Sequence, residues 1–143
     1  MFHQLSWAKE TCMRHNYRSI YTFSEISQVK RRDYTAASKV LHALVPELFV
    51  MWDDTIRSAY GCRIGKEEKG GERYFTFLKR VQNEAKEAVI TYCKEHGCTT
   101  DEAIRRIRKE LYEGGFYSLA RLIDVYNYQK YTRGKDELWQ KNT

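Results

Sequence analysis

Apolar residues recur along most of the chain at intervals of three and four positions, which is the pattern of helices with one buried face. No segment alternates apolar and polar residues for long enough to predict a strand. We therefore expect an all-α fold, a compact single-domain bundle of about seven helices. The predicted helices span residues 2–15, 17–29, 34–45, 53–60, 72–96, 100–113 and 118–131, and residues 132–143 form a polar tail that frays.

Cap residues support several of these boundaries. Asp33 stands where an N-cap begins the third helix, which must end before Pro46. Gly97 is typical of the position that ends a helix, and Thr99 followed by Glu102 has the spacing of a capping box. The buried face of the third helix is predicted to consist of Ala36, Ala37, Val40, Leu41 and Leu44.

Length and charge limit the class of protein. The chain has 143 residues and a formal net charge of +6, from 25 Lys and Arg against 19 Asp and Glu. This length favours one domain with its own core, and the charge favours polyanionic partners without requiring them. The N-terminus lacks the pattern of a signal peptide, and no apolar run is long enough for a membrane span. We expect a cytoplasmic protein with no membrane partner.

The four cysteines include no CxxC pair. In a reducing cytosol they are expected to be free thiols, with an intramolecular disulfide left open for a hyperthermophilic source. Zinc-type residues occur in Cys12-x-x-His15 and in Cys93-x-x-His96-x-Cys98, but neither has a standard zinc spacing. We therefore expect no metal and no cofactor.

A run of three cations, Lys30, Arg31 and Arg32, comes directly before the predicted N-cap Asp33. Free N–H groups at a helix N-terminus, flanked by cations, can hold DNA phosphates without reading the bases. We therefore expect double-stranded DNA as a partner, with these three side chains on phosphate. The plainer alternative is a solvated turn.

The stretch YTAASKVLHALVPELFVMWDDTIR leads from this turn through a helix, a proline and an apolar approach to Asp53. It resembles the core of the helix-hairpin-helix DNA glycosylases. It looks closest to the compact members with an 8-oxoguanine-glycosylase-like fold, in which an ASKxLH helix and a PxxFxxxD approach are typical. The resemblance covers the residues from about 29 to 57. It implies a helix-hairpin-helix-like element near residues 20–45, and it places Asp53 at the position of the family's essential aspartate.

This resemblance implies base excision, in which a damaged nucleotide is flipped out of the duplex and its N-glycosidic bond is cleaved. The aspartate would stabilise the cationic sugar. The Schiff-base lysine of bifunctional members falls on Thr35, and Lys39 lies one helical turn later as a displaced nucleophile, with activated water as the alternative. The family's Gly-apolar-Gly turn is replaced here by VKRRD. The candidate catalytic residues are thus Asp53 and Lys39, and the candidate DNA-binding residues are Lys30, Arg31, Arg32, Thr35 and Arg57.

Each of these side chains also has a structural interpretation. Asp53 and Asp54 fit a helix N-cap and its neighbour, and Lys39 fits a solvated lysine. His42 fits a satisfied histidine beside the apolar face better than a general base. The alternative function is therefore a non-catalytic helical module that binds DNA or a protein partner, for example an accessory or defence-system subunit. The substrate base and the oligomeric state stay open.

Overall fold

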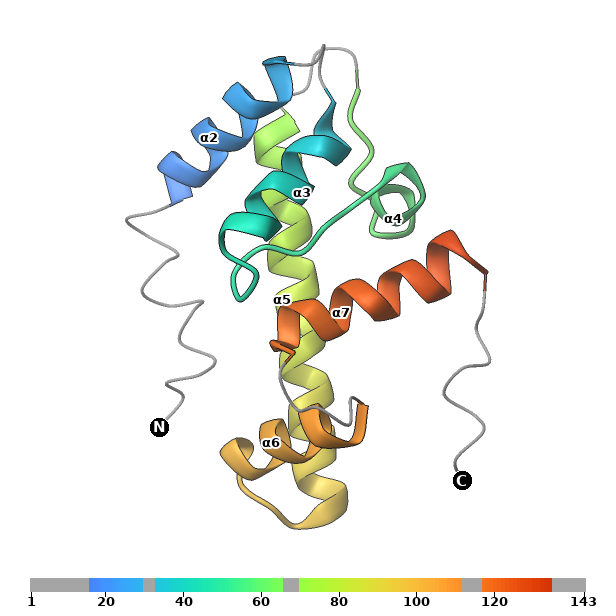
Figure 1. Cartoon of the computed structure of the whole chain (residues 1–143). Coiled ribbons are helices and arrows are strands. Elements are labelled where there is room, and N and C mark those ends of the chain that lie inside the picture. Colours follow the sequence, from blue (N-terminus) through green and yellow to red (C-terminus); the bar gives the residue numbers. More distant parts are fainter. Residues whose placement is uncertain (1–15, 30–32, 66–69, 112–116, 135–143) are drawn as a thin grey trace.

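The computed structural model describes residues 16–29, 33–65, 70–111 and 117–134. In these ranges the chain is helical and contains no strand, which confirms the all-α prediction (Figure 1). The helix predicted over residues 2–15 and the end of the helix predicted over residues 100–113 lie outside these ranges. The described elements are α2 (Asn16–Val29), α3 (Tyr34–Leu44), α4 (Asp54–Ala59), α5 (Gly70–His96), α6 (Thr100–Leu111), α7 (Leu119–Asn127) and a π-helical turn, η2 (Tyr128–Thr132).

The long helix α5 is the axis of the molecule (Figure 1). Its 27 residues extend over about 40 Å, far enough to contact two separate groups of helices. α2 packs on α3 and on one half of α5, while α6 packs on the other end of α5. α7 crosses α5 and continues into η2, which packs beside α4. None of the described helices is long and apolar enough to cross a membrane.

The caps predicted from the sequence are present. Oδ1 of Asp33 accepts a hydrogen bond from the N–H of Ala36 at 2.8 Å and so caps α3. Thr99 and Glu102 form the capping box of α6, in which the Thr99 N–H donates to Glu102 at 2.9 Å. Gly97 ends α5 with a φ of +58°, a left-handed conformation that glycine adopts without strain.

Two helix starts differ from the prediction. Asn16 is the first described residue of α2, against a predicted start at residue 17, and α5 begins at Gly70 instead of Glu72. A Cβ atom at Gly70 would collide with the ring of Tyr34, so glycine lets the start of α5 approach α3 closely. Apolar periodicity does not reveal this start because a glycine adds nothing to the pattern.

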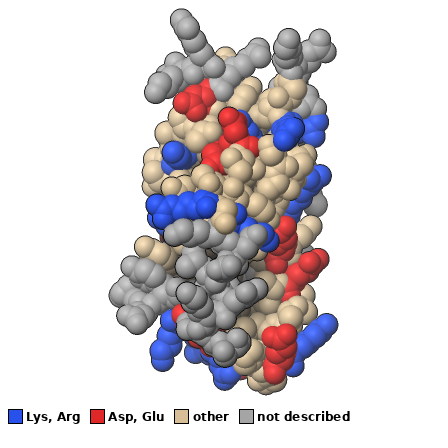
Figure 2. All heavy atoms as spheres, turned by 90° about the vertical axis from the view of Figure 1, so that its right-hand side faces the viewer, with Lys and Arg blue, Asp and Glu red and all other residues tan. Residues whose placement is uncertain are grey.

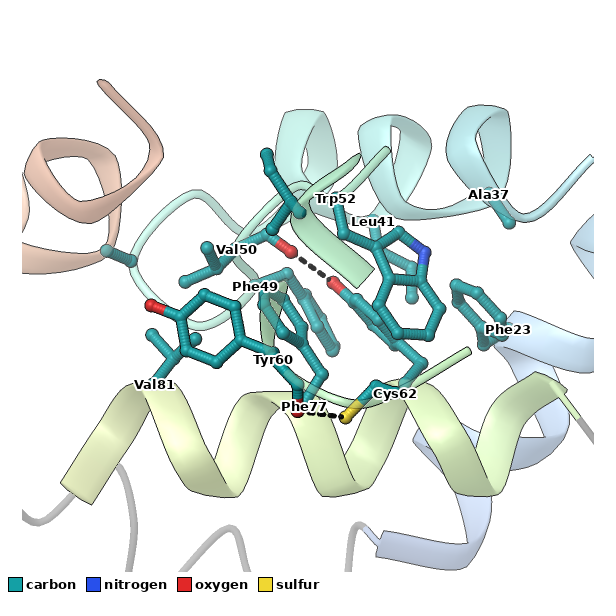
Figure 3. Close-up of a cluster of buried hydrophobic side chains, with 13 residues drawn as sticks. Phe23, Ala37, Leu41, Phe49, Val50, Trp52, Tyr60, Cys62, Phe77 and Val81 are labelled. Atoms are coloured by element: carbon teal, nitrogen blue, oxygen red, sulfur yellow. Dashed lines mark hydrogen bonds between the residues drawn. The ribbon is translucent and has the colours of Figure 1, made fainter. Parts of the chain in front are cut away.

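The larger of two cores lies between α2, α3, α5 and the segment 49–52, and it is built mainly of aromatic rings (Figure 3). Phe23 of α2 stacks on Tyr74 of α5 with ring centroids 4.3 Å apart. Trp52 meets Tyr74 edge-on at 5.0 Å, and Phe77 contacts both Trp52 and Tyr60. Such rings bury large apolar areas in fixed relative orientations. This core therefore fixes the positions of α3 and α4 relative to α5.

A smaller core joins the far end of α5 to α6. Val89 of α5 packs with Ala103 and Ile104 of α6, and all three are buried. The half-buried side chains around them are Tyr92, Cys93, Cys98, Ile107 and Leu119.

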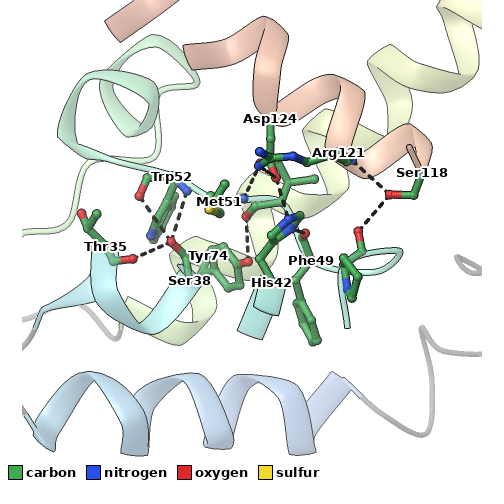
Figure 4. A network of polar contacts seen from close by, with 12 residues as sticks. Thr35, Ser38, His42, Phe49, Met51, Trp52, Tyr74, Ser118, Arg121 and Asp124 are labelled. Carbon is green, nitrogen blue, oxygen red and sulfur yellow. Dashed lines mark hydrogen bonds and ion pairs between the residues drawn. The ribbon is translucent and has the colours of Figure 1, made fainter. Parts of the chain in front are cut away.

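Between α3 and α4 the chain runs through the interior as a segment without regular structure, residues 49–52, and side chains bond its backbone (Figure 4). A buried backbone group left without a partner would cost about 1–3 kcal/mol, so these bonds are required for the segment to be buried. The pairs are Phe49 O with His42 Nδ1 (2.6 Å), Val50 O with the Tyr74 hydroxyl (2.8 Å), Met51 N–H with Asp124 Oδ1 (2.6 Å) and Trp52 N–H with Ser38 Oγ (3.2 Å).

The buried face of α3 differs from the predicted one. Val40 and Leu44 are 43% and 69% exposed, so two of the five predicted positions face solvent. The helix is rotated because Ser38 and His42 point inward to bond the segment 49–52. Polar residues thus occupy positions that an apolar pattern assigns to the surface. The buried residues of α3 are Ala37, Ser38, Leu41 and His42.

Candidate nucleic-acid interface

The N-terminal ends of α3 and α4 lie side by side. The indole N–H of Trp52, just before α4, donates to the carbonyl of Tyr34, the first residue of α3, at 3.2 Å. The guanidinium of Arg57 lies over both rings, 5.4 Å from the centroid of Trp52 and 5.9 Å from that of Tyr34. We call this region the α3–α4 corner; its residues are Asp33, Tyr34, Thr35, Trp52, Asp53, Asp54 and Arg57.

The corner brings three predicted site residues to one part of the surface. Thr35 lies in the first turn of α3, Asp53 is the N-cap of the short helix α4, and Arg57 lies in the last turn of α4. Lys39 is exposed and makes no hydrogen bond or ion pair with any described residue. The predicted cations at positions 30–32 lie outside the described residues, between the end of α2 and the cap of α3.

Asp53 caps α4, as the structural interpretation predicted. Its Oδ1 accepts the N–H of Ile56 at 2.8 Å, and its Oδ2 accepts the hydroxyl of Thr132 in η2 at 2.7 Å. A carboxylate has about four lone-pair sites, so each oxygen keeps one acceptor site after these bonds. The side chain is half-buried. The Asp53 side chain is thus held in one orientation, and each of its oxygens can still accept one more hydrogen bond.

Arg57 is the one cation among the seven described residues that define the corner. It pairs with Asp54, and burial lowers the pKa of its guanidinium from the usual value, an effect that Asp53, Tyr34 and Asp33 oppose. Three carboxylates of the corner therefore act on one guanidinium. Because carboxylates repel phosphate, the described charges of the corner give no net attraction for a polyanion.

A buried histidine–carboxylate pair joins the last turn of α3 to α7. The carbonyl of Phe49 can only accept, so His42 Nδ1, 2.6 Å away, must carry a proton; the same atom is 3.1 Å from Oδ2 of Asp124. Burial raises the pKa of Asp124 to about 6, and His42, the N–H of Met51 and Arg121 act in the opposite direction. His42 is buried and bonded, which confirms its interpretation as a satisfied core histidine.

Sequence reasoning missed Asp124. Its position does carry a signal, because Ala120, Asp124 and Asn127 are spaced as one buried helical face and all three are buried. An acid at a core-facing position requires a buried partner. That reasoning would have pointed to Asp124, although not to His42 as its neighbour.

The described residues contain no group of three His, Cys, Asp or Glu side chains able to hold a metal ion. Within Cys93-x-x-His96-x-Cys98, the ring of His96 stacks on Tyr92 at 3.9 Å, and its Nδ1 lies 3.0 Å from the Tyr92 carbonyl. The histidine is therefore engaged with its own helix. Cys12 and His15 lie outside the described residues.

A groove of about 670 Å³ runs between α5, α6 and α7, away from the corner. Its walls are mostly apolar, and the charged residues that line it are Glu84, Glu87 and Glu110. Carboxylates repel a phosphate backbone, so the groove is a poor site for DNA despite its size. On the face shown in Figure 2, cationic and anionic side chains are interspersed.

No family model, curated protein or solved structure matches the chain. The resemblance to helix-hairpin-helix glycosylases thus rests on the residues quoted for it alone.

Proposed function

We propose that the protein binds double-stranded DNA through the α3–α4 corner and the cations that precede it, in the manner of the helix-hairpin-helix glycosylases that residues from about 29 to 57 resemble. The observation that carries this proposal is the hydrogen bond from Trp52 to Tyr34, which holds the start of α4 beside the start of α3. Three consecutive cations, at positions 30–32, come just before α3 in the sequence. The N–H of Asp33 donates to the carbonyl of Ser27 at 3.1 Å, which brings the end of α2 to the start of α3. Two packed helices joined by a short basic connection are what a phosphate contact of this type needs.

Binding affinity for a fluorescein-labelled duplex tests this proposal. Because the carboxylates of the corner offset Arg57, removing the charges at positions 30–32 should remove most of the attraction. We expect the K30Q/R31Q/R32Q variant to bind at least about tenfold more weakly at 100 mM salt, since each lost phosphate contact weakens binding. The variant R105Q/R106Q/K109Q on exposed positions of α6 loses the same charge and is the matched control.

The control is expected to bind within about threefold of the wild type, because it changes net charge without touching the proposed contact. Equal weakening of both variants would mean that binding follows net charge alone. No binding by the wild-type protein at low salt would remove the proposal altogether.

Base excision at Asp53 is the activity that we propose for this site. Asp53 opens α4, is half-buried, and keeps an acceptor site on each oxygen. A carboxylate held in this way can stabilise positive charge that develops on a sugar as its N-glycosidic bond breaks. Water would then leave an abasic site, whereas attack by Lys39 would form a Schiff base and lead to strand cleavage.

A panel of duplexes with single damaged bases tests this activity. The Asp53→Asn variant keeps an oxygen for the α4 cap but loses the charge, so base release should fall by at least about 100-fold. Lys39→Gln should abolish borohydride trapping if the lysine is the nucleophile. Wild-type rates in Asp53→Asn would contradict a catalytic role.

A non-catalytic binding module is the second candidate. The observation that favours it is that both oxygens of Asp53 already serve the fold, in the α4 cap and in the bond to Thr132. In that case the wild-type protein binds duplexes but releases no base from any member of the panel.

A further inference from the structure

The turn between α5 and α6 places two cysteines opposite each other. α5 ends at His96, Gly97 takes a φ of +58°, and the N–H of Cys98 donates to the carbonyl of Cys93 at 3.2 Å. These are the features of a Schellman motif, in which an N–H beyond the left-handed residue bonds back to the carbonyl five residues earlier. The side chains of the two bonded residues often touch in this motif, usually through apolar groups. Here both of them are thiols.

The two side chains lie near each other. Cys93 is among the groups that raise the pKa of the Cys98 thiol, and both residues are half-buried against the smaller core. With ordinary bond lengths, the 3.2 Å backbone contact limits the two Cα atoms to about 7 Å apart. A disulfide needs Cα atoms about 4.4–6.8 Å apart with Cβ atoms that face each other. The Cα separation therefore falls in or near the range in which a disulfide closes without a large movement of the backbone.

We propose that Cys93 and Cys98 form a thiol–disulfide site, which closes to an intramolecular disulfide by exchange with a small disulfide such as oxidised glutathione. One thiolate attacks the glutathione disulfide, so that a mixed disulfide forms and one glutathione leaves as a thiolate. The second thiolate then attacks the protein sulfur of the mixed disulfide and releases the second glutathione. The protein loses two electrons and two protons, and the glutathione disulfide leaves as two thiols.

The surroundings distinguish this pair from the third described cysteine. Cys62 is fully buried, and its thiol donates to the carbonyl of Tyr60 at 3.4 Å.

Desolvation, followed by the charge of Cys93, raises the pKa of the Cys98 thiol. Since the thiolate is the reactive form, exchange through Cys98 should accelerate as the pH rises above neutrality.

Closure of the disulfide would restrain the start of α6. The two cysteines flank the turn that leads into this helix and pack on the cluster of Val89, Ala103 and Ile104. Amide hydrogen exchange in the first turns of α6 should therefore slow on oxidation, while exchange in α3 should be unchanged.

The full-length protein is incubated with oxidised glutathione, its free thiols are alkylated with N-ethylmaleimide, and its mass is measured before and after digestion with trypsin. Trypsin cleaves after Lys94, between the two cysteines, so the disulfide is expected to join the peptides 87–94 and 95–105. The intact protein should lose two maleimide labels, and dithiothreitol should restore both. Cys62→Ser should give the same linked peptides in equal yield, and Cys93→Ser should give none.

Wild-type protein that retains both labels overturns the proposal, as does a product that carries only glutathione adducts. Linkage of Cys93 or Cys98 to Cys12 or Cys62 also overturns it. The peptide map is made on the unmodified wild-type chain, so the outcome does not depend on whether a cysteine variant folds.

Discussion

Asp53 acts through both of its carboxylate oxygens, and only one of the two interactions could be predicted. The cap on Ile56 is local, and an acid directly before a helix predicts it. The bond from Thr132 joins residues 79 positions apart, and no local pattern contains it. The position of the candidate site residue was therefore predictable, whereas the group that occupies one of its oxygens was not.

Replacing Asp53 should separate its structural role from its charge. Asp53→Ala removes the cap and the acceptor for Thr132, and should lower the free energy of unfolding by about 1–2 kcal/mol. Asp53→Asn keeps an oxygen for the Ile56 N–H, so its loss should be clearly smaller. Urea unfolding of both variants measures the difference. If the asparagine variant is as unstable as the alanine variant, the cap does not hold as described.

The buried Asp124 should make stability depend on pH. Burial raises its pKa to about 6 in the folded protein, against about 3.9 for an unperturbed aspartate. A raised pKa means that the folded state binds the proton more tightly. The resulting stabilisation is fully present below about pH 4 and is lost as the pH rises through about 6.

The Asp124→Asn variant isolates this effect from the other carboxylates because an amide does not titrate in this range. The free energy of unfolding of the wild type, minus that of the variant, should fall between pH 4 and pH 7. Urea unfolding at several pH values gives this difference. A difference that stays constant or rises with pH would mean that Asp124 is not held in a desolvated site.

At the scale of the element, the segment 49–52 explains why α3 is turned as it is. The segment is buried without a helix or a strand to satisfy its backbone, so Ser38 and His42 of α3 point inward to do so. Periodicity finds the helix and its cap correctly, since those depend on nearby residues. It misplaces Val40 and Leu44 because the demand for hydrogen bonds comes from a different part of the chain.

The hydroxyl of Tyr74 provides a test of this role. It donates to the carbonyl of Val50 at 2.8 Å inside the core. Tyr74→Phe keeps the ring and leaves that carbonyl without a partner, so the free energy of unfolding should fall by about 1–3 kcal/mol. Tyr92→Phe is the matched control, because its hydroxyl bonds Glu110 at the surface. Denaturant unfolding that gives equal losses for the two variants would contradict the account.

For the whole molecule, the sequence predicts the number and type of the described helices but not their arrangement. The helices follow from periodicity and caps such as Asp33 and Gly97. The division into two cores along α5 depends on contacts such as Phe23 on Tyr74, which join residues far apart in the chain. Likewise, the cations at positions 30–32 and the acids Asp53 and Asp54 beside Arg57 are evident from the sequence, whereas the influence of Asp33 on Arg57 emerges only from the fold.

These opposing charges make the salt dependence of DNA binding the most direct measurement of the proposed function. The logarithm of the binding constant for a labelled duplex is plotted against the logarithm of the salt concentration, for the wild type and for K30Q/R31Q/R32Q. Each phosphate contact contributes about 0.9 to the magnitude of the slope, so the variant's slope should be smaller by up to about 3. The R105Q/R106Q/K109Q control should keep the wild-type slope. Equal slopes for the wild type and K30Q/R31Q/R32Q would contradict binding through this corner.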